Sequence, residues 1–175
     1  MKNMKKIFAL ILLFSGFASS SFAQAHANAT ASANILAPIT LTNKSDMAFG
    51  DIAVNNTGGT VTLPAHAGGI IASDRTFTGG ITFPTSTNPV SDAEFTVTGE
   101  KATTYAIILP ASCIINNGTN NMTIDNYVTD LGTTTPTLDG TTGTQTFYVG
   151  STLHVGPSQD HGAYSGTFTV TVNYN

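Results

Sequence analysis

The amino-acid sequence predicts an all-β protein, a single-domain antiparallel β-sandwich, immunoglobulin-like in outline, with about ten short strands. Charge is scarce, because only 9% of the 175 residues are charged and Thr, Asn, Ser and Gly supply most of the polarity. Neutral polar residues, many of them β-branched, suit the outer faces of strands better than those of helices. Apolar and polar residues alternate with period two along much of the chain. Beyond residues 1–23, the sequence shows no stripe of apolar residues at the i, i+3, i+4, i+7 spacing of a helix.

Residues 1–23 are expected to be a cleaved export signal. The apolar stretch Ile7–Phe17 is shorter than the roughly 20 residues that a membrane-spanning helix needs. Small residues follow it, so that cleavage fits after Ala23 or after Ala25. The positive residues before it are Lys2, Lys5 and Lys6. We therefore expect an exported protein of a Gram-negative bacterium, in the periplasm, at the cell surface or outside the cell, with no membrane span in the mature chain.

Residues 24–175 are expected to form one secreted domain, with 24–35 as an extended N-terminal arm. The alternation is longest at this end, where small apolar side chains fall on odd numbers and polar ones lie between them. The segment is either the domain's own first strand, or an arm over Ala27–Ile35 followed by a strand that starts near Ile39. The odd-numbered positions of the arm are Ala27, Ala29, Ala31, Ala33 and Ile35.

The remaining strands follow from alternation bounded by Gly, Pro and Asn turn signals. Turns are expected at Asn55–Gly59 and Gly99–Lys101, the second closing a β-hairpin. Gly150 either separates two strands or bends one. The expected strands are Met47–Val54, Thr60–Leu63, Arg75–Thr78, Gly80–Phe83, Glu94–Thr98, Thr103–Leu109, a short one at Met122–Ile124, Gln145–Val149, Ser151–Val155 and Tyr164–Tyr174.

No enzyme, metal or cofactor is expected. The histidines that could act as bases or ligands, His66, His154 and His161, lie in no recognised metal or catalytic spacing. In Ser151–Val155 the imidazole of His154 is expected on the surface, opposite Leu153. Asp125, Asn126 and Asp130 lack the dense alternation of a calcium loop. Asp and Asn are common in turns for reasons unrelated to metal binding.

Two further classes of function are weighed against composition. The scarcity of Lys and Arg argues against a nucleic-acid partner, which needs a basic patch for the phosphates. The single cysteine, Cys113, cannot form an intrachain disulfide and is expected to be a small buried apolar residue.

A monomeric extracellular or periplasmic binding module, for example for carbohydrate, is the alternative function. Tyr127 and Tyr148, out of phase with their apolar neighbours, are expected to face solvent and would carry it.

Three stretches resemble an uncharacterised family of secreted bacterial β-domains, described as a domain of unknown function. They are ATASANILAPITLTNKSDMAFGDI, FTVTGEKATTYAIILP and YVGSTLHVGPSQDHGAYSGTFTVTVNYN. More distantly, Met47–Gly50 and Gly162–Tyr174 resemble the spore-coat-U and archaic chaperone–usher pilins, many of which carry a disulfide that this sequence lacks.

The pilin resemblance implies a pilin-like sandwich and a structural or adhesive role at the cell surface. The subunit would be fimbrial and would polymerise by donating Ala27–Ile35 to the next copy. The partners implied are the protein itself and a periplasmic chaperone. The chaperone would contact the last strand at Val170, Val172 and Tyr174.

Overall fold

The computed structural model describes residues 24–85 and 88–175. The expected export signal at residues 1–23 lies outside the described residues. The chain divides into two units, Met1–Asn34 and Ile35–Asn175. In the first unit, residues 24–34 belong to no strand or helix and are all exposed. The second unit contains every strand described below.

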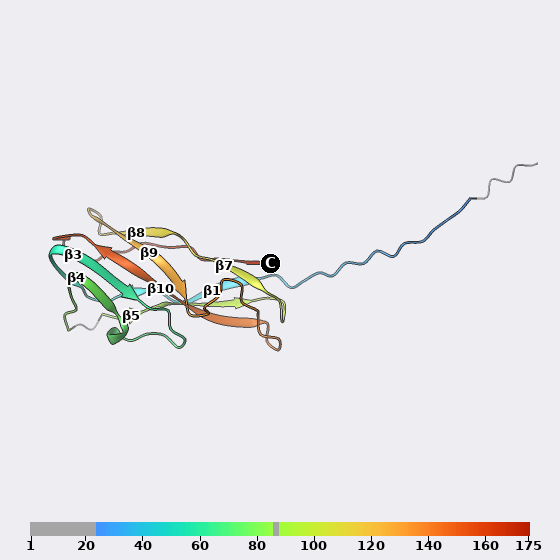
Figure 1. Cartoon of the computed structure of the whole chain (residues 1–175), viewed down its shortest axis with the longest axis horizontal. Coiled ribbons are helices and arrows are strands. Elements are labelled where there is room, and N and C mark those ends of the chain that lie inside the picture. The colour runs from blue at the N-terminus through green and yellow to red at the C-terminus, as the bar shows by residue number, and fades with distance from the viewer. Residues whose placement is uncertain (1–23, 86–87) are drawn as a thin grey trace, which may run out of the picture. The chain divides into compact units, whose positions relative to one another are not determined.

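Antiparallel strands make up the second unit, as the sequence predicts (Figure 1). The only helical element in the described ranges is the short 3-10 turn η1, Ala72–Asp74. The strands are β1 Thr40–Ser45, β2 Ala48–Phe49, β3 Ala53–Leu63, β4 Thr76–Thr82, β5 Val90–Ser91, β6 Ala93–Thr98, β7 Tyr105–Ile108, β8 Ser112–Asn116, β9 Asn121–Thr129, β10 Thr144–Val155 and β11 Thr171–Tyr174.

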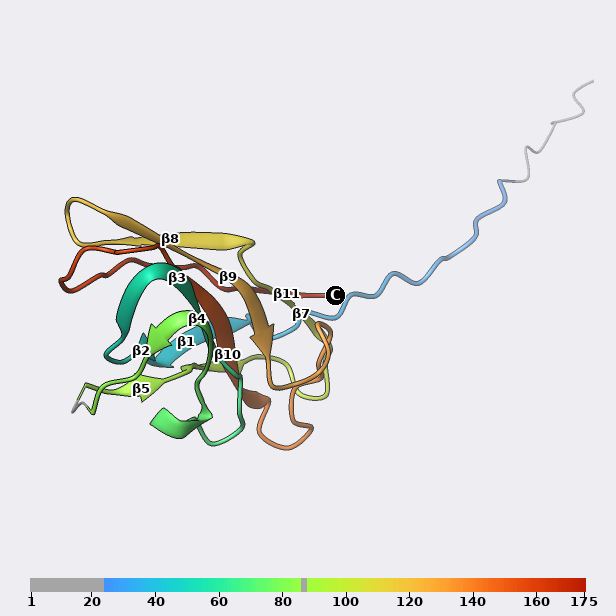
Figure 2. The same ribbon diagram turned by 60° about the vertical axis from the view of Figure 1, so that its left-hand side comes forward.

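β10 is the central strand of a seven-stranded sheet whose main path is β1–β6–β10–β3–β4. Its first half, Thr144 to Val149, pairs with β6, and its second half pairs with β3 and with β9. β8 adds to the far side of β9. A second, two-stranded sheet joins β11 to β7, and a two-residue ladder joins β2 to β5. Figure 2 shows β8 above β4 and β1, while β9, which pairs with both β8 and β10, joins the two layers of the curled sheet.

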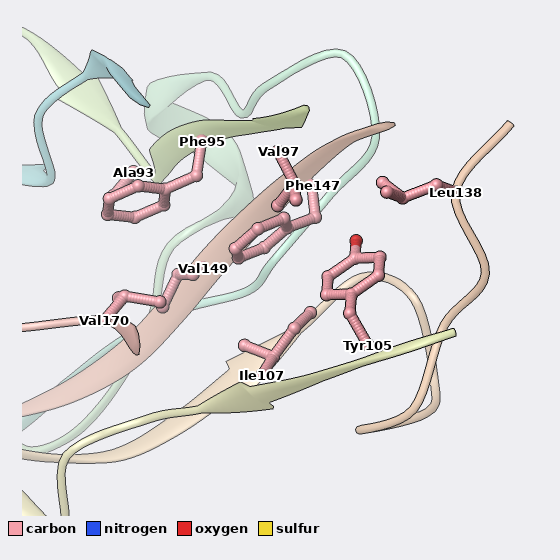
Figure 3. Packing of buried hydrophobic residues seen from close by; sticks show 9 residues of the cluster. All are labelled: Ala93, Phe95, Val97, Tyr105, Ile107, Leu138, Phe147, Val149 and Val170. Carbon is pink, nitrogen blue, oxygen red and sulfur yellow. The ribbon is translucent and has the colours of Figure 1, made fainter. Parts of the chain in front are cut away.

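The core lies between these layers because each strand turns one set of alternate side chains inward. Apolar residues of β6 and β10 face β7 and the C-terminal stretch (Figure 3). The rings of Phe95 and Phe147 stack with their centroids 5.6 Å apart. The cluster comprises Ala93, Phe95, Val97, Tyr105, Ile107, Leu138, Phe147, Val149 and Val170. A second cluster, between β3, β4, β9 and β10, comprises Val61, Ile81, Ile124, Leu153 and Val155.

The predicted hairpin of Glu94–Thr98 with Thr103–Leu109 is wrong. β6 pairs with β1 and β10, whereas β7 pairs with β11. The turn between them carries the chain from one layer to the other. Val97 and Tyr105 therefore meet across the core, where both are fully buried. The alternation identified the inward side chains correctly, but it contains no information about the ladder partner.

Strand boundaries also differ from the sequence prediction, first on either side of Gly50. Met47–Val54 is interrupted at Gly50, and β3 continues through the predicted turn Asn55–Gly59. The register of β3 with β4 shifts between Val54 and Gly59, so these residues form a bulge. Within it, the side-chain oxygen of Asn55 accepts hydrogen bonds from the amide and hydroxyl of Thr57.

The strands Arg75–Thr78 and Gly80–Phe83 form one strand, β4, which passes through Gly79 at φ +68°. A Cβ at this glycine would lie 2.4 Å from the carbonyl oxygen of Gly58. The predicted break is therefore a bulge that only glycine accommodates. Gly150 was expected either to separate two strands or to bend one. The second form is observed, because β10 continues through Gly150 as a single strand.

The C-terminal half of the sandwich contains a strand that the alternation missed. β8, Ser112–Asn116, carries Cys113, and β9 extends from Asn121 to Thr129, beyond the predicted Met122–Ile124. Conversely, only Thr171–Tyr174 of the predicted last strand Tyr164–Tyr174 lies in a ladder. The even-numbered side chains from Phe168 to Tyr174 nevertheless turn inward. Val170 is buried, and Phe168, Val172 and Tyr174 are half-buried against the core.

Candidate functional site

An elongated groove of about 1080 Å³ opens along one side of the second unit. One wall is the stretch from Leu41 to Val54, with β1 and β2, and the other is the C-terminal stretch from Gln159 to Val170. Its floor is apolar and belongs to both layers. The floor residues are Phe95, Cys113, Ile115, Met122, Ile124, Leu153 and Val155. Its volume exceeds the roughly 300–1,000 Å³ of an ordinary small-ligand pocket.

Both walls of the groove are strand edges. β1 ends the main path of the seven-stranded sheet and pairs with β6, and β2 pairs with β5. In the opposite wall, the bridge between Ser165 and Asn116 is the only ladder pairing found among the described residues 162–170. A groove between two such edges can accept an extended chain that pairs with the walls and places alternate side chains on the floor.

The residues expected to form the N-terminal arm are exposed to solvent. Ala27, Ala29, Ala31 and Ala33 are exposed and in no strand. Ile35 is 93% exposed and Leu36 is 42% exposed, so two consecutive large apolar side chains lie in water before β1. The domain's own first strand starts at Thr40, close to the Ile39 named as the start in the second of the two alternatives.

The three residues expected on the last strand are part of the core. Val170 is 9% exposed, and Val172 and Tyr174 pack against the first cluster. The hydroxyl of Tyr174 donates a hydrogen bond to the carbonyl of Ala37 and accepts one from the amide of Glu100. Val172 and Tyr174 pair with Ile107 and Tyr105 of β7.

Cys113 is half-buried at the floor of the groove, and therefore less buried than expected. The hydroxyl of Tyr127 donates a hydrogen bond to its sulfur over 2.9 Å. Tyr127 also packs against Phe168, with ring centroids 5.0 Å apart. The expectation that Tyr127 faces solvent is thus wrong, because a bulge at Asn126, φ +50°, returns its ring to the core. Burial, followed by the bond to Cys113, raises the pKa of Tyr127.

Tyr148, the other tyrosine expected to face solvent, is half-buried. Its backbone amide donates a hydrogen bond to the carboxylate of Asp130 over 2.7 Å. With Tyr127 turned inward, the two tyrosines do not form an exposed aromatic platform.

The candidate acid–base and metal residues do not come together. His154 is exposed, as expected, and its Nε2 lies 2.8 Å from a carboxylate oxygen of Asp125. Asn126 bonds the same carboxylate, while Asp130 bonds the amide of Tyr148. Across residues 24–85 and 88–175, no three His, Cys, Asp or Glu side chains are grouped to hold a metal ion.

Two features of the groove were missed by the reasoning from sequence. Arg75 reaches the wall at Phe49 and Asp51 from the start of β4. Gly50, which lies inside the expected strand Met47–Val54, has φ +69° and turns the wall between these two residues. A single arginine among so few cations was the available signal for the first of them.

A family model described as a domain of unknown function, DUF4402, matches residues 39–174. The chain belongs to the DUF4402 family. The DUF4402 match includes every strand and both walls of the groove, and residues 24–34 precede it. Searches of the curated proteins and of the solved structures find no match for the chain. In the part of this DUF4402 protein that the structure describes, no helix is long and apolar enough to cross a membrane.

Proposed function

We propose that the protein is an exported structural subunit that polymerises at the cell surface, the N-terminal segment of one copy lying in the groove of the next. The observation that carries this proposal is the apolar groove of about 1080 Å³ between two strand edges. Its floor leaves Cys113, Ile115 and Met122 half-buried in the single chain. Covering apolar surface of this kind stabilises an assembly by about 25 cal/mol per Å².

The proposed occupant is the stretch Ala27–Ile35. Its side chains alternate between small apolar and polar ones, and as a strand it would extend roughly 30 Å at about 3.4 Å per residue. The odd-numbered side chains would lie on the floor of the groove. The even-numbered ones, among them Asn28 and Thr30, would remain in water. His26 is the only ionisable side chain in residues 24–36, so that little charge is desolvated.

The walls of the groove would supply backbone hydrogen-bond partners to the entering strand. Backbone amides and carbonyls buried without partners are costly, so a buried strand needs neighbours on its edges. β1 on one side and residues 162–170 on the other provide such edges. Transfer of one copy's segment to another copy is a heterologous contact, which continues into an open filament where the rotation between copies does not close into a ring. A periplasmic chaperone that covers the groove before assembly belongs to the same proposal.

The test uses two full-length variants that differ in the phase of the alternation. Ala31→Asp places a carboxylate on the floor of the groove, whereas Thr30→Asp places it on the outer side of the same strand. We expect the exported Ala31→Asp protein to be a monomer and the Thr30→Asp protein to form fibres like the unchanged chain. Size-exclusion chromatography and negative-stain electron microscopy measure both.

Cys113 provides an independent measure of occupancy, because it is the only cysteine and lies on the floor. In the polymer its reaction with a maleimide should be at least tenfold slower than in the Ala31→Asp monomer. A clean monomer of the unchanged chain, with Cys113 equally reactive in all three proteins, would contradict the proposal. That result would favour a monomeric binding module instead.

A further inference from the structure

We infer that Arg75 is the positioning residue of the groove, holding the wall at Phe49–Ile52 in place for the incoming strand. The inference rests on the proposed function, since it assigns a role in strand entry. The ladder that attaches this wall to the rest of the fold is short, because β2 and β5 pair only Ala48 with Ser91 and Phe49 with Val90. A wall that keeps one edge for a partner must be held from its other side.

Side chains provide that attachment. Nη1 of Arg75 donates a hydrogen bond of 2.5 Å to the carbonyl of Phe49 and one of 3.3 Å to the carbonyl of Asp51. The Nε of the same side chain donates to the carbonyl of Ala72 over 3.2 Å. One guanidinium thus connects the wall to the turn η1. Asn88 adds a bond to the carboxylate of Asp51.

The guanidinium is itself held in one position. Its central carbon lies 3.9 Å from the ring centroid of Phe83, a cation–π contact. The Phe83 ring packs at 76° against that of Phe77, with centroids 5.1 Å apart. Arginine suits this place because its planar donors are fixed relative to each other, whereas the single amino group of lysine cannot bind carbonyls in the same arrangement.

Gly50 shows how closely the guanidinium approaches the wall. A Cβ at Gly50 would lie 2.9 Å from Nη1 of Arg75 and 2.7 Å from a methyl carbon of Val90. The wall therefore turns at a residue with φ +69° and no side chain, directly against the arginine. None of the three fixed cations in the described ranges, Arg75, Lys44 and Lys101, lines the groove itself. Arg75 acts from behind the wall, through its bonds to the carbonyls of Phe49 and Asp51.

The experiment separates this inference from the proposed function. The host is the full-length Ala31→Asp chain, whose own segment is disabled, and the probe is a fluorescent peptide of residues 24–36 with the natural sequence. Binding is followed by stopped-flow anisotropy. Three further changes are made in this host: Arg75→Met, Arg75→Lys and, as the matched control, Lys101→Met.

We expect Arg75→Met to slow peptide association about tenfold, because bonds from a charged donor to the wall are lost before the strand enters. Dissociation should be little changed, since the seated strand holds the wall from the groove side. Arg75→Lys should give an intermediate association rate, and Lys101→Met the rate of the host. A change that only weakened the fold would instead lower the unfolding temperature and accelerate dissociation.

The results that would overturn the inference fall into two groups, which differ in whether the proposed function survives. Host-like association in Arg75→Lys or in a folded Arg75→Met protein would overturn the role of Arg75 and leave the proposed function standing, and so would an equal loss in Lys101→Met. A peptide that does not bind the host with Arg75 intact would overturn the proposed function, and the role of Arg75 with it.

Discussion

The hydroxyl of Tyr174 donates a hydrogen bond of 2.8 Å to the carbonyl of Ala37. It also accepts a bond of 2.5 Å from the amide of Glu100. The last strand, the chain just before β1 and the turn after β6 therefore meet at one phenol oxygen. This contact links Ala37, just before β1, to the last strand and to the turn after β6.

Tyr174→Phe removes these two bonds and keeps the ring against the core. We expect the free energy of unfolding to fall by about 1–3 kcal/mol, since each of the two bonds contributes about 0.5–1.5 kcal/mol. Urea denaturation followed by circular dichroism measures it. Tyr164→Phe is the comparison at the start of the same stretch, because it also removes two phenol bonds, one to the carbonyl of Asp160 and one from the side-chain amide of Gln159, but no link to Ala37. An unchanged midpoint for Tyr174→Phe would show that water replaces both bonds without loss.

Phe147→Ala tests the first core cluster. Phe147 is fully buried and stacks on Phe95, so its loss should destabilise the fold by about 3–5 kcal/mol. Phe77→Ala is the matched control, because Phe77 is 51% exposed at the edge strand β4. We expect the control to cost much less. Equal losses of thermal stability in the two variants would mean that the layers do not pack as described.

Asp92 makes the stability depend on pH. Its carboxylate, 2% exposed, accepts a hydrogen bond from the amide of His66 over 2.9 Å. Burial is the largest influence and raises the pKa of Asp92 above its ordinary value of 3.8. A carboxyl whose pKa is higher in the folded state keeps its proton there, so stability declines as pH rises above 3.8 toward the folded value.

Asp92→Asn keeps an oxygen for the amide of His66 and removes the ionisation. Its unfolding temperature should therefore decline less than that of the unchanged chain as the pH rises above 3.8, the ordinary pKa of the group. Differential scanning calorimetry across this range measures the difference. Parallel profiles for the two proteins would assign the pH dependence to other carboxylates.

Deletion of residues 24–34 should leave the fold intact and abolish any polymer. Every described strand and both core clusters lie after residue 39. Far-ultraviolet circular dichroism should remain that of a β-protein, and electron microscopy should show no fibres. Loss of the β spectrum would contradict the donation of this segment, because it would make the segment part of the domain's own fold.

The sequence alone predicted the fold class and the inward face of most strands. The even-numbered side chains from Phe168 to Tyr174 and the odd-numbered ones of β10 turn inward as the alternation indicates. This succeeds because period two is a property of the extended backbone itself, and burial of one face is imposed on each strand separately. The start of β1 near Ile39 was one of two alternatives, and the strand at Thr40 agrees with it.

Only the tertiary structure decided which strands are neighbours. β6 and β7 are close in sequence yet lie in different layers, because ladder bonds join backbone groups that are the same in every residue. The groove depends on those pairings, since its walls and floor come from distant parts of the chain. Arg75 gained its place against Phe49 in the same way. Side-chain identity determined what each strand buries, and packing of the layers determined which edges stayed open.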